Sequence, residues 1–157
     1  MSKSESGAPS IAFSTSDLLI HSLSCGLDRP VVTFSDTGQV VTAGEFRDVV
    51  SRYAQALRSK GLKKGARVGL ISRNRPEVLF VHGAVAFVDV CIVPLHLMGS
   101  LDDIAYMVED AGIEAMIFDS GHYQDMVRTL QQRAPRLKYL FALGPTDIGE
   151  DLTELAE

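Results

Sequence analysis

The sequence predicts an α/β fold: a doubly wound, mostly parallel sheet with flanking helices and an N-terminal β-hairpin. Short strand-like runs alternate with amphipathic helical patterns through most of the chain, which is the order expected of β-α-β units. The later runs are almost wholly apolar, as are strands that helices cover on both faces. With 157 residues, the chain has the length of one domain.

The composition is that of an ordinary globular protein and argues against several function classes. A net charge of −5 favours neither a nucleic-acid partner nor an anionic membrane. The longest apolar run, 78–88, is shorter than the ~20 residues that a membrane span needs. Cys25 and Cys91 lie in unrelated elements, and Cys91 falls in a strand that we expect to be buried. We therefore interpret both as reduced thiols of a cytoplasmic protein.

We expect three segments along the chain: a disordered leader at 1–14, an α/β subdomain at 15–144, and a truncated linker or helix start at 145–157. The leader consists mainly of small and polar residues, a composition typical of disorder. At the start of the subdomain, Thr15 or Ser16 is expected to cap a leucine-rich helix.

A hairpin and a long helix come next. The runs 31–34 and 39–41 are joined by Ser-Asp-Thr-Gly, which suits a turn, and we expect this hairpin to pack beside the parallel core. Thr42 and Glu45 have the spacing of a capping box. The helix that they begin has the clearest apolar period in the chain, and Gly61 is expected to end it.

A β-α-β unit forms the centre of the predicted sheet. Its strands are expected at 68–71 and 90–93, with an apolar helix between them. Asn74 is expected to cap this helix through its side-chain oxygen, with Pro76 in the first turn and Glu77 closing a capping box.

Two more helices and two more strands complete the prediction and bring the parallel sheet to four strands. They are a helix that Ser100 caps and Gly112 ends, a strand at 115–118, a helix at 122–133 and a strand at 137–143. Crossovers between such strands are right-handed.

Ligands bind doubly wound sheets beyond the carboxyl ends of the strands. The candidate positions are therefore the four stretches that follow strands, Ser72–Asn74, Leu95–Gly99, Asp119–His122 and Gly144–Thr146. Of these, Leu95–Gly99 has no evident capping or turn role before its glycine, so we expect function most at His96 and Met98. Arg73 and Arg75 flank a helix start, where they could meet an anionic ligand or form a solvated rim.

Several motifs with well-defined chemistry are missing from the sequence. It has neither G-x-G-x-x-G nor G-x-x-x-x-G-K-[ST], and no G-x-S-x-G. His21 and Cys25 are four residues apart, but zinc needs three or four ligands and no second pair is present. Asp119 is expected to cap a helix rather than to hold a cation, and His82 is expected to lie in the core. We therefore predict no metal site.

Five pieces of the sequence, taken in order, resemble the N-terminal portion of the adenylate-forming enzymes, the group of acyl-CoA synthetases, luciferases and peptide-synthetase adenylation domains. The pieces are V-V-T-A-G-E-F, A-x-x-L-x-x-x-G-L-K-K-G-A-R-V, N-R-P-E, V-P-L and L-D-D-I-A-Y-M-V-E-D-A-G-I-E-A-M-I-F-D, within 31–143. Within the group the chain looks most like a bacterial fatty-acid–CoA ligase. The resemblance implies a partial N-terminal domain of the acyl-CoA synthetase fold.

Such a ligase activates a carboxylic acid with ATP and magnesium, forms an acyl-adenylate and transfers the acyl group to CoA. The resemblance implies that these cofactors belong to the full-length enzyme and that the fragment holds none of them, because the family's nucleotide motifs are not in this stretch. No catalytic residue carries over. The loop after V-P-L lies near the family's acyl and pantetheine channel, so His96, Leu97 and Met98 are the expected substrate-binding residues. The expected partners are a fatty acid and the rest of the polypeptide, with a homodimer as a further option.

The sequence departs from the family pattern at three places. Ala66 replaces the usual Asp, Asp89-Val90 replace Gly-Ala, and His96-Leu97 replace Asn-Pro, which leaves the substrate class open. Two alternatives also remain: a flavodoxin-like module that binds a small anionic ligand through the two arginines near the helix start, and a self-associating interaction domain.

Overall fold

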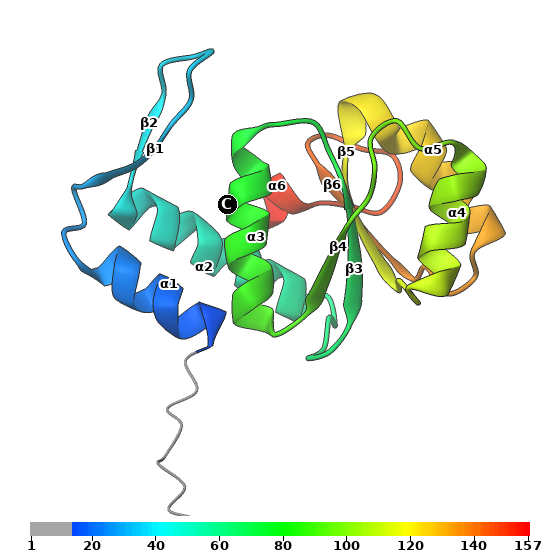
Figure 1. Ribbon diagram of the computed structural model, residues 1–157, viewed down its shortest axis with the longest axis horizontal. Coiled ribbons are helices and arrows are strands. Elements are labelled where there is room, and N and C mark those ends of the chain that lie inside the picture. The colour runs from blue at the N-terminus through cyan, green and yellow to red at the C-terminus, as the bar shows by residue number, and fades with distance from the viewer. Residues whose placement is uncertain (1–13) are drawn as a thin grey trace, which may run out of the picture.

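A five-stranded parallel sheet forms the centre of the computed structural model, which describes residues 14–157 (Figure 1). The strand order is β4-β3-β5-β6-β7, and β1 and β2 form a separate antiparallel pair. The strands are β1 (Pro30–Thr33), β2 (Val40–Thr42), β3 (Arg67–Ile71), β4 (Cys91–Pro94), β5 (Ala115–Asp119), β6 (Tyr139–Leu143) and β7 (Glu150–Asp151). The helices are α1 (Thr15–Ser24), α2 (Ala43–Ser59), α3 (Pro76–Val88), α4 (Leu101–Asp110), α5 (Ser120–Arg133) and α6 (Leu152–Leu155).

Helices cover both faces of the sheet, which confirms the predicted doubly wound fold. Because successive side chains of a strand point to opposite faces, each strand contributes to two cores. Val68, Leu70 and Ile117 pack in the core that includes α2, α3 and α6. Ile71 and Met116 pack in the core that includes α4 and α5. The near-continuous apolar runs of the strands follow from this two-sided cover.

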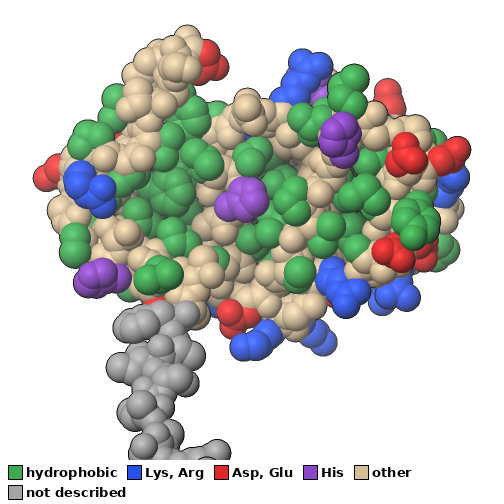
Figure 2. All heavy atoms as spheres, in the orientation of Figure 1, with side chains coloured by type: hydrophobic (Ala, Val, Ile, Leu, Met, Phe, Trp, Pro, Cys, Tyr) green, Lys and Arg blue, Asp and Glu red, His purple; other side chains and the backbone are tan. Residues whose placement is uncertain are grey.

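The β1-β2 hairpin is not part of the parallel sheet (Figure 1), but it packs against the core on the α2-α3 side, where Val41 is buried and Val31, Val32 and Phe34 are partly buried. Helices α2 and α3 occupy that face of the sheet, and α3 lies between α1 and the strands (Figure 1). The turn forms as predicted, with Gly38 N donating to Phe34 O at 2.8 Å. We call residues 14–42, which include α1 and the hairpin, the N-terminal arm. Hydrophobic side chains gather in the hollow between the hairpin and α3 (Figure 2).

The helix starts confirm most of the predicted caps. The capping boxes before α2 and α4 form as expected, but α1 is capped by Ser14 rather than by Thr15 or Ser16. Ser14 Oγ accepts from Asp17 N at 3.1 Å, and Ser14 N donates to the Asp17 carboxylate at 3.0 Å. The two alternative caps have leucines at the reciprocal position and cannot close this box. The rest of the leader, 1–13, lies outside the described residues.

The start of α3 differs from the prediction that Asn74 caps it. Arg75 is the N-cap residue, with φ −156° and ψ 158°, and makes no side-chain cap. The cause is Pro76, because the residue before a proline is kept out of the helical region. Glu77 consequently closes no capping box, and its carboxylate instead accepts from Arg75 Nε at 2.8 Å.

Three further expectations, for Cys91, His82 and the number of strands, differ from the structure. Cys91 is exposed rather than buried, because β4 is an edge strand that, within residues 14–157, pairs with β3 alone, and it also contains Pro94. His82 is exposed on α3 rather than in the core. A fifth strand, β7, extends the sheet within the predicted linker, where two acidic residues give no strand signal and the buried Leu152 follows them.

Candidate functional site

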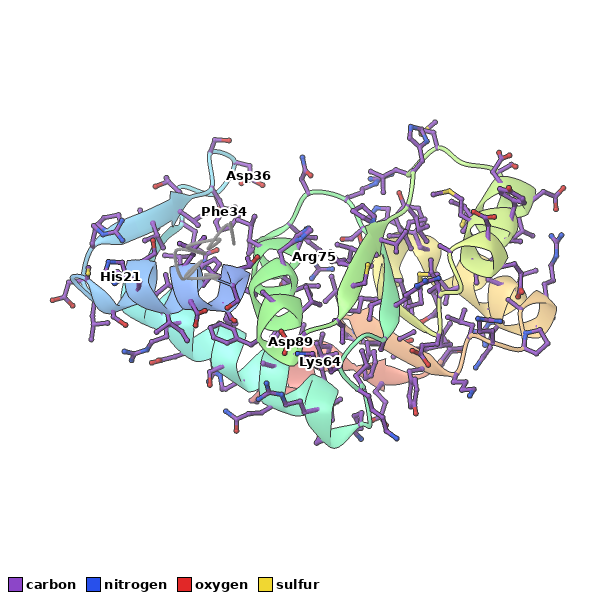
Figure 3. The ribbon with its side chains drawn as sticks, turned by 60° about the horizontal axis from the view of Figure 1, so that its bottom comes forward. His21, Phe34, Asp36, Lys64, Arg75 and Asp89 are labelled. Carbon is purple, nitrogen blue, oxygen red and sulfur yellow. The ribbon has the colours of Figure 1, made fainter. Side chains whose placement is uncertain are left out.

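A polar cluster lies at the carboxyl ends of β5 and β6, beside the start of α3. Arg75 Nη1 contacts Asp119 Oδ1 at 3.3 Å and donates to the Leu143 carbonyl oxygen at 2.7 Å, while its Nε binds Glu77. Asp119 Oδ2 lies 2.9 Å from His122 Nδ1. Figure 3 shows Arg75 between α3 and the sheet. The cluster therefore joins three segments that are distant in sequence.

Asp119 is the one buried charged residue among those that the structure describes, with 5% of its surface exposed. Its Oδ1 accepts from Gly121 N at 3.1 Å, which confirms the expected cap of α5. All of its contacts are to donors: the arginine, the histidine ring and this amide. A buried carboxylate with such partners avoids the cost of unpaired burial.

The charges of the cluster shift the pKa values of their neighbours. Burial alone would raise the pKa of Glu77, but the hydrogen bond and positive charge of Arg75 hold it below the ordinary value. The hydrogen bond to Glu77 in turn raises the pKa of Arg75. Tyr53 of α2 is also affected, because burial, with a smaller contribution from the Glu77 charge, raises its pKa to about 12. Around neutral pH the ion pair of Arg75 and Glu77 is fully charged.

The four stretches predicted to follow strands differ in what they contribute to this cluster. The third supplies Asp119 and His122. Asp119 contacts both His122 and Arg75, the residue just after the first stretch. The fourth follows Leu143, whose carbonyl accepts from Arg75. The second contributes none of the cluster's hydrogen bonds or ion pairs among residues 14–157.

The loop after β4 has its own turn. Met98 N donates to His96 Nδ1 at 3.2 Å, and Gly99 N donates to the His96 carbonyl at 3.0 Å. His96 therefore has the turn role that the sequence did not reveal. Leu97 is 39% exposed and Met98 is 86% exposed, so two apolar side chains are accessible to solvent at the carboxyl edge of the sheet. Their substrate-binding role stays a prediction.

The arrangement of Arg75 does not suit an anion-binding site. Its guanidinium already serves two carboxylates and a carbonyl, so few donors remain for a ligand. Arg73 is exposed, as a solvated rim residue would be. The flavodoxin-like alternative therefore loses one of the two arginines on which it depended.

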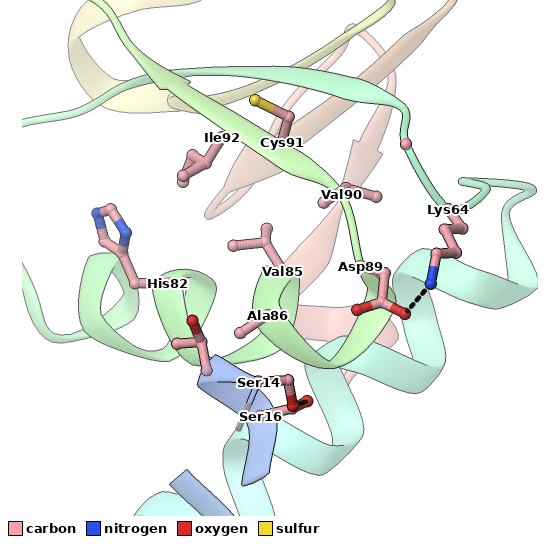
Figure 4. A pocket seen from close by; sticks show the side chains of 12 residues that line it. Ser14, Ser16, Lys64, His82, Val85, Ala86, Asp89, Val90, Cys91 and Ile92 are labelled. Atoms are coloured by element: carbon pink, nitrogen blue, oxygen red, sulfur yellow. Dashed lines mark hydrogen bonds and ion pairs between the residues drawn. The ribbon is translucent and has the colours of Figure 1, made fainter. Parts of the chain in front are cut away.

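A hollow of about 610 Å³ lies elsewhere, between the start of α1, the end of α3 and the edge of β4 (Figure 4). Its one ion pair joins Lys64 Nζ and Asp89 Oδ2 at 3.2 Å, and both side chains are largely exposed. No three metal-binding side chains converge within residues 14–157. In the same range, no helix has the length and apolar character that crossing a bilayer requires.

Fold and cluster together define a doubly wound α/β segment whose polar groups bind one another and hold its carboxyl-edge loops in place. Residues 22–157 match the family described as AMP-binding enzyme. The chain is 36% identical over 129 residues to the medium/long-chain-fatty-acid–CoA ligase FadD8 of Mycobacterium tuberculosis, a match that covers 82% of this chain and 22% of the relative. The chain thus belongs to the AMP-binding enzyme family.

Solved structures show the same fold. The anthranilate CoA ligase AuaEII, solved with anthranoyl-AMP, has a TM-score of 0.81 at 14% identity over 92% of this chain and 28% of its own. Coronafacic acid ligase of Pectobacterium brasiliense has a TM-score of 0.77 at 16% identity over 90% of this chain and 29% of its own. The chain spans about a quarter of the length of such proteins.

Proposed function

We propose that this chain is the N-terminal part of an ATP-dependent fatty-acid–CoA ligase of lipid metabolism. The full-length enzyme would convert a carboxylate and ATP into an acyl-adenylate and pyrophosphate, and then transfer the acyl group to CoA. The observation that carries the proposal is the 36% identity with a ligase named for medium- and long-chain fatty acids. A carboxylate needs such activation because its oxygen is a poor leaving group until it is joined to phosphate.

The residues of this chain do not fit magnesium-bound ATP. Magnesium bound to ATP takes one or two carboxylates from the protein and its other ligands from phosphates and water. The buried carboxylate of Asp119 is already engaged by Arg75, His122 and an amide. We therefore assign ATP, magnesium and CoA to other parts of the full-length enzyme, and no adenylation step to this segment.

We propose that this segment contributes to the binding of the carboxylic acid substrate. We propose that His96, Leu97 and Met98 border the acyl substrate, which their exposure at the carboxyl edge supports. The remaining polypeptide is the expected partner. A cytoplasmic location is consistent with the free thiols of Cys25 and Cys91.

A chimera tests the proposal. This chain replaces the matching residues of the mycobacterial ligase, and acid-dependent exchange of pyrophosphate into ATP is measured. We expect exchange from the chimera and none from the isolated chain. Exchange by the isolated chain, or a folded chimera without exchange, would contradict the proposal. In an active chimera, Met98→Ala should raise KM for the acid, whereas Tyr106→Ala, an exposed change on α4, should not.

A further inference from the structure

An apolar groove of about 540 Å³ separates the N-terminal arm from α3. Side chains from three helices and one strand line it, and most of them are aliphatic or aromatic. They include Leu19, Leu23, Val31, Val32, Phe46 and Leu79. We call this hollow the arm groove.

Large hydrophobic side chains are exposed along the groove and on the arm that borders it. Leu79 is 40% exposed, and on the arm Leu18 is 60%, Ile20 is 52% and Val40 is 48% exposed. Single exposed leucines are ordinary in globular proteins, but a contiguous apolar hollow marks an interaction surface. An apolar occupant fits this lining best, because most of its side chains are aliphatic or aromatic and only Arg29 and His82 among them are ionisable.

The shape of the groove argues against a second copy as its occupant. A two-fold interface requires the same surface on both subunits to be self-complementary, and two hollows cannot fill each other. The projecting tip of the hairpin is polar, with Ser35, Asp36 and Thr37 at its turn. It therefore offers no apolar side chain to insert into the hollow of a partner.

The length of the related enzymes points to a different occupant for the groove. The chain covers 22% of the mycobacterial relative and 28% of the anthranilate ligase, so such enzymes contain several hundred residues outside the matched part. We propose that the arm groove receives an apolar segment from the remaining polypeptide of the same ligase. This inference rests on the proposed function, because it requires that a longer ligase chain exists.

Amide hydrogen exchange tests the inference without measuring catalysis. The isolated chain is compared with the chimera in which it replaces the matching part of the mycobacterial ligase. Amides of α1, β1 and β2 should exchange about tenfold more slowly in the chimera, because covering a surface suppresses its local opening. Leu79→Glu should abolish this added protection in the chimera. Tyr106→Glu, a matched change at a side chain 69% exposed on α4, should leave it intact.

Two results would overturn the inference. One is equal exchange of the arm in the isolated chain and the chimera. The other is protection that rises with concentration in the isolated chain, disappears with Leu79→Glu and is not increased in the chimera, which would assign the groove to a second copy. A protected but inactive chimera would refute only the proposed ligase function, so the two failures are distinguishable.

Discussion

Replacing Arg75 with methionine tests whether the polar cluster holds the carboxyl edge together. Methionine keeps much of the aliphatic bulk but removes the contacts to Glu77, Asp119 and the Leu143 carbonyl. Breaking a buried ion pair costs ~3–5 kcal/mol. The Arg75 and Glu77 side chains are 28% and 25% exposed, so water can replace part of the loss. We expect the free energy of unfolding to fall by about 2 kcal/mol, measured by urea unfolding.

The pH dependence of this loss has a definite sign. The pKa of Glu77 in the folded chain lies below its ordinary value of 4.5, so the stabilisation by its charged form is present above pH 4.5 and is lost as the pH falls through the lower folded-state value. The stability difference between wild type and Arg75→Met should therefore shrink below pH 4.5. Arg73→Met is the control, because Arg73 is exposed and should change stability by less than ~0.5 kcal/mol. Equal losses from both variants would refute the reasoning.

Three further substitutions test packing, backbone strain and burial. Gly83→Ala should cost ~1–3 kcal/mol in urea unfolding, because its Cβ would lie 2.7 Å from a valine methyl of α2; Gly121→Ala, where the nearest atom is 3.5 Å away, should cost nothing. Asp89→Gly should raise the free energy of unfolding by ~0.5 kcal/mol, because Asp89 has φ 57°; a glycine variant less stable than Asp89→Ala would contradict this. Burial raises the pKa of Tyr53 to about 12. The stabilisation linked to this shift is complete below the ordinary pKa of 10.0 and is lost as the pH rises through 12. Tyr53→Phe should therefore lessen the loss of stability at alkaline pH, whereas Tyr106→Phe should not.

Local signals in the sequence were enough to predict most of the fold. The capping boxes before α2 and α4 and the alternation of apolar strands with helices depend on residues a few positions apart. The missed features depend on tertiary context. Strand β7 is two acidic residues that become a strand only by pairing with β6, and Cys91 is exposed because nothing among residues 14–157 pairs with the outer edge of β4.

The candidate site was less predictable, for the same reason. The sequence placed Asp119 and Arg75 at the carboxyl edge, but they are 44 residues apart and nothing local indicates that they bind each other. The cap role of Asp119 was predictable because Gly121 is close in sequence. The expected cap at Asn74 failed because the constraint of Pro76 on the preceding residue outweighed the cap preference of asparagine.

The edge strand β4 has a consequence for contacts between chains. Cys91 N donates to the carbonyl of Ala66, just before β3, and Leu95 N donates to the Leu70 carbonyl of β3. The backbone groups of Ile92 and Pro94 therefore face outward in this parallel pairing. Proline has no amide hydrogen, which leaves Ile92 as the outward donor of the strand. The opposite edge, β7, is two residues long. Both borders of the sheet therefore offer few backbone groups to a strand of another chain, which should limit edge-to-edge association.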